Sequence, residues 1–258
     1  MNDHFIKALS LALLGLAVNL CSAETNPGAK PAANSAVSVP AAEAALPSVQ
    51  SSSAPKLPNL FANAIPAAWA VGDTPPKPWQ IPNTDPEIVT LVVERDGVRW
   101  IELKDDSTEK AASLRQQFQP LKAGRLSFRI AVGSDHIGQI GVFLGQGNAS
   151  AEVERIVELK MDSRGVIFMG SAGKREKTAV SLAPGAKDHL FVEFSCSNEN
   201  LNLRLGRIEK DGTDTLVAES TIPQQGHAVS RLRIATDLAP RGGHFYVTDL
   251  VLTARAAP

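Results

Sequence analysis

The sequence predicts an all-β protein, an antiparallel β-sandwich built from two packed sheets. Hydrophobic residues recur at every second position in Leu126–Val132 and again in Arg155–Met161, which is the period of a strand with one face in a core. Asp162 and Gly165 follow the second segment, and both residue types favour the tight turns that join antiparallel strands. Because no segment has a convincing helical period and no fixed-length repeat is present, a single sandwich is favoured.

The first residues have the composition of a cleaved export signal. A leader that contains Lys7 precedes the apolar run Ala8–Val18, and we predict a signal peptide over residues 1–23 that ends on a small residue. A membrane anchor is the alternative, but the apolar run is shorter than the roughly 20 residues that a bilayer requires. A lipoprotein site at Cys21 is disfavoured because Leu20 precedes it. We therefore predict a secreted, periplasmic or cell-surface protein with no integral membrane segment after signal cleavage.

Residues 24–58 are rich in alanine, proline and serine and contain few large apolar side chains. Such a composition cannot bury enough surface to offset the conformational entropy of an ordered chain. We predict a disordered linker there, semi-extended by its prolines. The remaining residues, 59–256, are predicted to form one β-sandwich domain.

Charge and cysteine content limit the partners and the covalent chemistry. The formal net charge of the chain is -1, so nucleic acid and anionic membranes are not expected as partners. After signal removal Cys196 is the only cysteine, which excludes an internal disulfide. Cys196 continues the inward phase of Leu190, Val192 and Phe194, so we predict a buried thiol rather than a nucleophile.

The segment 59–85 carries Trp69, Trp79 and several prolines, and we predict irregular structure laid over the sandwich. The two tryptophans either plug the edge of the sandwich, which we favour, or form exposed stacking platforms. The β-rich runs Ile88–Glu94 and Val98–Lys104 flank an Asp-Gly pair. That arrangement is a strong hairpin signal, because Asp and Gly both tolerate the positive φ of a two-residue turn.

Further strands are predicted on both sides of the central meander. Polar turns, several of them containing glycine, separate the runs and favour antiparallel neighbours. About a dozen strands in roughly 190 residues suit one two-sheet sandwich. The additional runs are Leu114–Phe118, Thr178–Leu182, Leu190–Phe194, Asn200–Leu205, Thr215–Ala218, Ser230–Ala235 and Phe245–Leu252.

The order of these features resembles the concanavalin A-like lectin and glucanase superfamily, in its laminin-G-like jelly-roll form. The resemblance covers about residues 59–256 and implies extracellular recognition of sugars or proteins. In some branches it also implies a structural calcium ion or glycoside hydrolysis. It rests on Phe118 followed by Gly124–Ile130, on Val157–Gly165, on Leu190–Phe194 and on Phe245–Val251.

Two groups of side chains are candidates for ligand binding. An aromatic side chain can stack on the face of a sugar, and the candidates are Trp79, Trp100 and Tyr246. For Trp100 burial is equally plausible, because it shares its strand phase with Val98. Four arginines fall on the polar phase of three predicted strands, and in one sheet they would form a cationic stripe for carboxylated or sulfated glycans. We favour a solvated face whose charge neighbouring glutamates balance. The arginines are Arg129, Arg204, Arg231 and Arg233.

Asp249 is the main candidate for a metal ligand. It shares its predicted strand phase with Phe245 and Val247, and a carboxylate among apolar neighbours requires an arginine, backbone donors or a cation. One interpretation is a structural Ca²⁺ site with Asp105 or Asp106, because calcium prefers hard oxygen ligands. The other is a strand end that reaches solvent. No further cofactor is predicted.

Carboxylates in Glu152–Glu158 lie nearest to the Glu-x-Asp-x-x-Glu pattern that the resemblance associates with glycoside hydrolysis. Glu152, Glu154 and Glu158 share one phase of the expected strand, but their spacing differs from that pattern, and we favour a solvated strand face. The histidines of the mature chain lack metal-ligand spacing and are predicted to be polar surface or satisfied neighbours. They are His136, His189, His227 and His244.

The sequence therefore predicts a secreted, non-catalytic carbohydrate-binding module with a polysaccharide or glycan as its partner. Two alternatives stay open. One is a glycan-cleaving glycoside hydrolase of the same fold. The other is a structural or protein-interaction module of a cell envelope, which would present a flat, closed surface and have no affinity for sugars.

Overall fold

The computed structural model describes residues 59–61, 68–107, 109–147, 149–223, 227–236 and 242–256. These residues form fourteen strands and one short 3-10 turn, so the predicted all-β class is confirmed. No helix in this part of the chain is long and apolar enough to cross a bilayer. The predicted signal peptide and linker lie outside the described residues and stay predictions.

The strands pair into two antiparallel sheets, here named A and B. Sheet A contains β1 (Asn59–Phe61), β2 (Ile88–Arg95), β3 (Val98–Asp105), β5 (Ala123–Val132), β10 (Lys187–Cys196), β11 (Asn200–Ile208), β12 (Asp214–Pro223) and β14 (Gly243–Ala254). Sheet B contains β4 (Ser113–Leu121), β6 (Ile140–Gly145), β7 (Arg155–Met161), β8 (Val166–Ser171), β9 (Lys174–Ser181) and β13 (Val229–Thr236).

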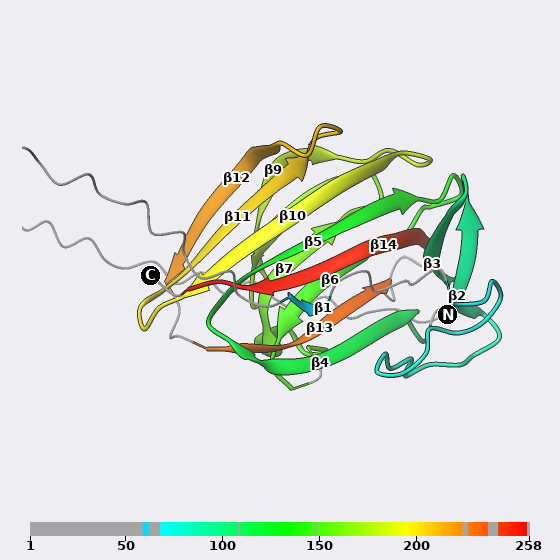
Figure 1. Ribbon diagram of the computed structural model, residues 1–258, viewed down its shortest axis with the longest axis horizontal. Helices are drawn as coiled ribbons and strands as arrows, with labels where there is room; N and C mark the ends of the chain where they lie inside the picture. The colour runs from blue at the N-terminus through cyan, green and yellow to red at the C-terminus, as the bar shows by residue number, and fades with distance from the viewer. Residues whose placement is uncertain are drawn as a thin grey trace, which may run out of the picture. The chain divides into compact units, whose positions relative to one another are not determined.

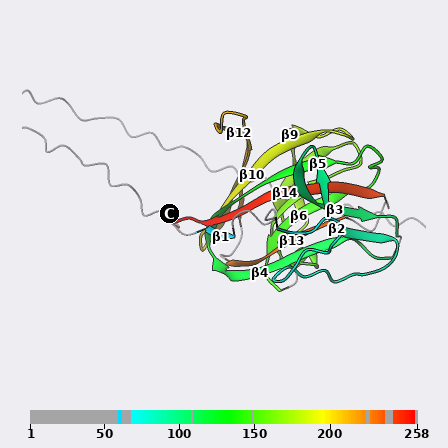
Figure 2. The same ribbon diagram turned by 45° about the vertical axis from the view of Figure 1, so that its right-hand side comes forward.

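Both sheets have an order that brings distant parts of the chain together. Sheet A runs β12-β11-β10-β5-β14-β3-β2, and β1 pairs with the C-terminal part of β14. Sheet B runs β4-β13-β6-β7-β8-β9. Figures 1 and 2 show β5, β10 and β14 side by side in one layer, with β6 and β13 in the other. The chain therefore forms the predicted two-sheet sandwich.

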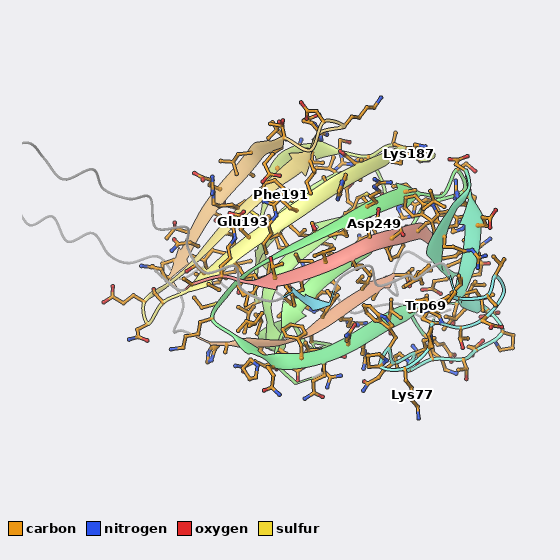
Figure 3. All side chains as sticks on the ribbon, in the orientation of Figure 1. Trp69, Lys77, Lys187, Phe191, Glu193 and Asp249 are labelled. Atoms are coloured by element: carbon orange, nitrogen blue, oxygen red, sulfur yellow. The ribbon has the colours of Figure 1, made fainter. Side chains whose placement is uncertain are left out.

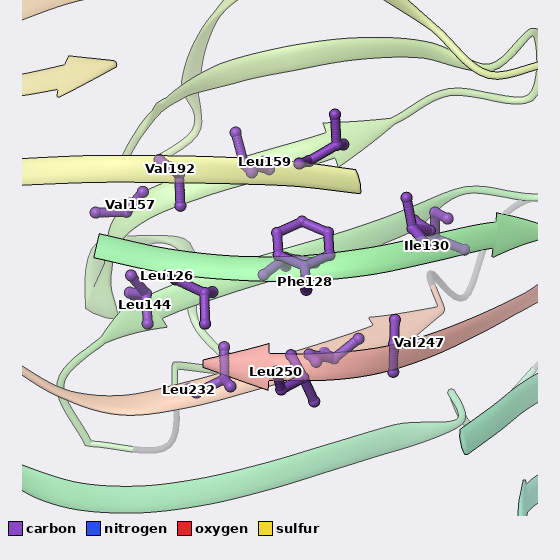
Figure 4. Close-up of a cluster of buried hydrophobic side chains, with 14 of the residues drawn as sticks. Leu126, Phe128, Ile130, Leu144, Val157, Leu159, Val192, Leu232, Val247 and Leu250 are labelled. Atoms are coloured by element: carbon purple, nitrogen blue, oxygen red, sulfur yellow. The ribbon is translucent and has the colours of Figure 1, made fainter. Parts of the chain in front are cut away.

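The core lies between the sheets and follows the predicted alternation. Leu126, Phe128 and Ile130 of β5 all belong to one buried cluster, which they share with Leu144 of β6 and Leu159 of β7. Figure 4 shows these side chains meeting between the two layers. Burial of such side chains is the main favourable contribution to folding, at about 1.5–3 kcal/mol for each large apolar residue.

The hairpin between β2 and β3 has the predicted turn. Its two loop residues, Asp96 and Gly97, both have positive φ, 51° and 72°. Positive φ at both central positions gives a two-residue turn whose twist matches that of the flanking strands. In the meander, Gly165 has φ of 81°, and Oδ1 of Asp162 accepts hydrogen bonds from the amides of Arg164 and Val166, each at 2.9 Å. Both predicted turns are confirmed.

Two predictions about buried residues are confirmed. Cys196 is 5% exposed, and burial raises the pKa of its thiol to about 11, so the reactive thiolate is scarce at neutral pH. Trp79 lies in the main core, and the partly buried Trp69 packs against it. The tryptophans thus close the edge of the sandwich, as favoured.

A β-bulge in β14 corrects the predicted phase of Asp249. The register of β14 against β5 shifts between Thr248 and Val251, and Asp249 itself has a positive φ of 51°. The extra residue advances the side-chain alternation by one position. Leu250 therefore enters the core, whereas the Asp249 side chain is 41% exposed on the outer face of sheet A. The prediction that Asp249 shares the inward phase of Phe245 is wrong.

Candidate functional site

A groove of about 540 Å³ lies on the outer face of sheet A. It is bounded by the tip of the β2–β3 hairpin on one side and by the turn after β11 on the other, and β5 and β10 form its floor. We refer to it as the sheet A groove. Figure 3 shows Lys187 at one end of β10 and Asp249 on β14, both on this face of the sheet.

Strand pairing sets the floor of the sheet A groove. Arg129 of β5 is opposite His189 of β10 on one side and opposite Thr248 of β14 on the other. Nε of Arg129 lies 3.1 Å from Oδ2 of Asp249, which the bulge has turned onto the same face. Burial lowers the pKa of His189, and the positive charge of Arg129 lowers it further, so this imidazole is neutral at pH 7.

The walls of the groove combine apolar surface with charge. Val98 and Trp100 face the groove from β3. Asp96 at the hairpin tip forms an ion pair of 3.3 Å with Lys187. Residues 208–210, at the end of β11 and in the turn after it, form the opposite wall.

The arrangement suits a ligand that both donates and accepts hydrogen bonds. The lining has four basic side chains, Arg95, Arg129, Lys187 and Lys210, and three acidic ones, Asp96, Asp188 and Glu209. A hydroxyl group can use both kinds, because it has one donor proton and two acceptor lone pairs. A concave site with an apolar wall and a few converging polar groups is typical of small-molecule binding.

None of the three aromatic candidates is an exposed platform, so the structure supports burial, which was favoured for Trp79 and left equally open for Trp100. The exposed fractions are 6% for Trp79, 6% for Trp100 and 9% for Tyr246. Trp100 and Tyr246 form a small cluster on the outer face of sheet A, and the guanidinium carbon of Arg95 lies 3.8 Å from the Tyr246 ring centroid. Burial raises the pKa of Tyr246 to about 12, together with the negative charge of Glu102. Of the three, Trp100 lines the groove.

The four arginine candidates lie on two different sheets. Arg129 and Arg204 belong to β5 and β11 of sheet A, whereas Arg231 and Arg233 belong to β13 of sheet B. The predicted single cationic stripe is therefore wrong. Arg204 pairs with Glu193 at 3.2 Å, so the favoured interpretation of a charge-balanced face holds on sheet A. Figure 3 shows Glu193 on β10 beside this strand.

The three aspartates predicted to bind calcium do not meet. Asp105 is fully buried and accepts hydrogen bonds from a backbone amide at 2.8 Å and from a threonine hydroxyl at 3.0 Å. It is opposite Gly243, six residues before Asp249, a separation of roughly 20 Å along a strand. Asp106 pairs instead with Lys104 at 3.7 Å. The described residues contain no group of three metal-ligating side chains, and a shared site at these aspartates is excluded by their separation.

The glutamates of the hydrolase alternative do not share a strand face. Glu152 and Glu154 lie in the 3-10 turn η1 (Glu152–Glu154) before β7, and the Glu154 carboxylate accepts a hydrogen bond of 3.0 Å from the Ser150 amide. Glu158 of β7 is fully buried. The premise that these three carboxylates line one face is wrong, because the strand begins only at Arg155.

A second cluster of titratable groups surrounds His244 near the start of β14. Nε2 of His244 lies 2.7 Å from Oε1 of Glu102, and Nδ1 contacts the carboxylate of Asp135. Burial lowers the pKa of His244, but hydrogen bonds to the two carboxylates outweigh that effect and raise it. His136 accepts a hydrogen bond of 3.0 Å from the His244 amide. His244 is a satisfied neighbour, as predicted, whereas Nε2 of His136 is buried without a hydrogen-bond partner among the described residues.

We expect the His244 cluster to make stability depend on pH. Because the folded-state pKa of His244 is raised from 6.5, its contribution is complete below pH 6.5 and is lost as pH rises through the folded value. The pKa of Asp135 falls from 3.8 to about 2, so its contribution is complete above pH 3.8 and is lost near pH 2. His244→Gln should therefore destabilise the protein more at about pH 5 than at about pH 8.5. Urea denaturation at both pH values measures this difference, and an equal loss at both would contradict it.

Sequence reasoning missed most of the sheet A groove. Only the Asp-Gly turn indicated that Asp96 stands at a hairpin tip. Lys187 and His189 were not associated with Arg129, because β5 and β10 are far apart in sequence and their pairing is a property of the sheet order. Asp249 lies beside Arg129 because of a β-bulge, and no glycine or other turn residue in the sequence indicates that bulge.

Comparison with known proteins gives matches in structure only. No protein-family model matches the chain, and no curated protein matches it in sequence. A sialidase is similar with 13% identity and a TM-score of 0.51, over 68% of this chain and 17% of that one. Lectin II from Ulex europaeus is similar with 13% identity and a TM-score of 0.46, over 72% and 94% of the two chains. The VIP36 exoplasmic/lumenal domain is similar with 11% identity and a TM-score of 0.46, over 78% and 91%.

At these identities the likeness concerns the fold alone, and this chain spans less than a fifth of the sialidase. The two antiparallel sheets agree with the β-sandwich that the sequence resemblance implied, and the matched part of the sialidase shares this fold. The narrower laminin-G-like form stays a prediction.

Proposed function

We propose that the protein binds a glycan without cleaving it, and that the ligand lies in the sheet A groove. The observation that carries this proposal is the convergence of basic and acidic side chains against the apolar wall formed by Val98 and Trp100. Hydroxyl groups of a sugar can accept from Arg129 and donate to the carboxylates, while carbon-bound hydrogens contact the wall.

The nearly balanced charge of the groove favours a neutral glycan. Arg129 is paired with Asp249, and Lys187 is paired with Asp96, so neither cation requires a charged ligand. Recognition then depends on the directions of hydrogen bonds rather than on net charge. Directional polar contacts of this kind give specificity among sugars that differ only in the orientation of a hydroxyl.

We also propose that the protein acts outside the cytoplasm. The support is the predicted signal peptide over residues 1–23 and the predicted linker that follows it. N-terminal sequencing of protein recovered from the extracellular or envelope fraction should begin at Glu24. Recovery of the chain with Met1 intact in the cytoplasm would contradict the location but not the binding site.

Removing polar groups from the floor should weaken glycan binding. We expect Arg129→Gln to raise the Kd by about tenfold or more, because a hydrogen bond to a charged group contributes about 1.5–3 kcal/mol. His189→Ala should raise it by about two- to tenfold, because the imidazole is neutral and a neutral hydrogen bond contributes about 0.5–1.5 kcal/mol. A glycan array on the full chain selects the ligand, and calorimetry measures the Kd. The control is Arg164→Ala, whose side chain is 80% exposed in the turn between β7 and β8 of sheet B.

Three outcomes would contradict the proposal. Unchanged affinity in both floor variants would place the glycan elsewhere. Absence of any glycan binding by the folded chain, together with binding of a protein, would favour the protein-interaction alternative. Release of new reducing ends from the bound glycan would favour the hydrolase alternative.

A further inference from the structure

The outer face of sheet B differs from that of sheet A in its charge. We refer to it as the basic face, because outward positions on four of its strands carry seven basic side chains. They are Arg115 of β4, Arg231 and Arg233 of β13, Arg155 and Lys160 of β7, and Arg175 and Lys177 of β9. The whole chain has a formal net charge of -1, so this concentration is local.

Cross-strand pairing aligns the centre of the basic face in one row. Arg115 is opposite Arg233, Arg233 is opposite Phe143, and Phe143 is opposite Glu158. Glu158 is opposite Gly170, and Gly170 is opposite Arg175. Among these described residues Glu158 is the one carboxylate of the row. It is fully buried, with Arg175 at 3.2 Å and Arg155 at 3.6 Å.

A pocket of about 270 Å³ opens on the basic face beside this row. Three basic side chains, Arg155, Lys160 and Arg233, are part of its lining, together with the ring of Phe143. The guanidinium carbons of Arg155 and Arg233 lie 4.4 Å and 5.7 Å from the ring centroid. The aromatic ring thus holds two of the three cations in place through cation–π contact.

Gly141 allows the Phe143 ring to take this position. A Cβ atom at Gly141 would lie 2.1 Å from the ring, so the ring covers the space that a side chain would occupy. Lys160 is opposite Gly141 on β7 and therefore borders the same space. Phe143 also forms a small buried cluster with Ala149 and Ala235.

Three arginines of the basic face each have one buried donor that is not satisfied within the described residues. Nε of Arg115, Arg155 and Arg231 is buried in each case and has no hydrogen-bond partner among the described residues. Buried donors without acceptors are uncommon in folded proteins. Of these three arginines Arg155 lines the pocket, and guanidinium donors match the geometry of planar or tetrahedral oxyanions.

We propose that the pocket on the basic face binds the oxyanion group of an anionic glycan, a carboxylate or a sulfate ester. Arg155, Lys160 and Arg233 donate hydrogen bonds to the oxyanion, and the other basic side chains of the face attract the rest of the chain. This site lies on the sheet opposite to the sheet A groove. It does not depend on the function proposed for that groove.

A glycan fits this face better than a nucleic acid or a membrane. Stacking of bases requires exposed aromatic rings, and Phe143 is 5% exposed. A pocket of about 270 Å³ accommodates one charged sugar unit of a longer chain.

The test is calorimetry on the full chain with three hexasaccharides, a heparin fragment, an oligogalacturonate and cellohexaose. We expect one of the two anionic probes to bind, and its affinity should fall with salt as surface charges are screened. The double variant Lys160→Ala/Arg233→Gln should raise the Kd of that probe at least tenfold, since each removes a charge-assisted hydrogen bond. Circular dichroism and thermal denaturation confirm that the variant is folded.

Two further double variants separate the two sites. Lys77→Ala/Arg164→Ala removes the same charges from exposed positions elsewhere and should leave every Kd unchanged. Lys187→Ala/Arg129→Gln removes them from the sheet A groove and should weaken neutral-glycan binding alone. The relative affinity of the heparin fragment and the oligogalacturonate decides between sulfate and carboxylate.

Three results would overturn the assignment of the basic face. The first is that neither anionic probe binds to the folded protein. The second is that the Lys160→Ala/Arg233→Gln variant binds the anionic probe as tightly as the unmodified chain. The third is that duplex DNA or vesicles of anionic phospholipid bind more tightly than either anionic hexasaccharide and lose affinity in the same variant.

Discussion

Replacing Phe128 by alanine is expected to lower the free energy of unfolding by about 3–5 kcal/mol. Phe128 is 1% exposed at the centre of β5, where it contributes to the core between the two sheets. With Leu159 and Phe245 it already borders a small cavity of about 20 Å³. Because backbone hydrogen bonds on both sides hold β5 in place, the sheets can collapse only partly into the space that the ring leaves. Figure 4 shows the ring between the layers.

Urea denaturation measures this loss, and the slope of the transition reports whether the unfolded state has changed as well. Phe168→Ala is the matched control, since Phe168 lies on the outer face of β8 and is only partly buried. We expect that variant to lose less than half as much stability. Equal losses in the two variants would contradict a core sealed between the sheets.

Glu158→Gln is expected to destabilise the protein by about 2–4 kcal/mol. The carboxylate is fully buried, and burial raises its pKa, whereas Arg175 and Arg155 favour the charged form. Glutamine has nearly the same shape but no charge, so the variant leaves two cations on the face without their central carboxylate. The side chains of Arg155 and Arg175 are 14% and 21% exposed, respectively, and the remaining contact with water moderates the loss.

The control for Glu158→Gln is Asp162→Asn, which removes the charge of a pair whose arginine is exposed while the aspartate side chain is 18% exposed. Nη2 of Arg164 lies 3.1 Å from Oδ2 of Asp162, and the Arg164 side chain is 80% exposed. Exposed pairs contribute about 0–1 kcal/mol, and asparagine retains the side-chain oxygen of the turn. If Glu158→Gln destabilises no more than Asp162→Asn, then Glu158 does not balance the arginines of the basic face.

Strand phase was predictable wherever local alternation was regular. Leu126, Phe128 and Ile130 point inward as expected, because the side-chain period of a strand is two and the core selects one phase. The Asp96–Gly97 turn was equally predictable, because its positive φ values depend only on the two residues that adopt them. In both cases the physical cause acts over a few residues of sequence.

The prediction of inward or outward orientation failed where the backbone departed from the two-residue period of a strand. The bulge in β14 moves Asp249 to the outer face, and the 3-10 turn before β7 keeps Glu152 and Glu154 away from the face of Glu158. Each of these irregularities shifts the alternation by a residue and leaves little trace in composition. The predicted inward phase of Asp249 and the predicted shared face of the glutamates were both wrong for this reason.

The sequence by itself determined the all-β class, the two faces of most strands, the hairpin turn and the buried thiol of Cys196. The tertiary structure alone decided which outward side chains share a face. It divided the four arginine candidates between two sheets, placed His189 beside Arg129, and aligned Arg233, Phe143 and Glu158 in one row. The physical reason is that neighbours across a sheet are set by strand order and register, which depend on how the whole core packs, whereas inward or outward orientation depends on each strand alone.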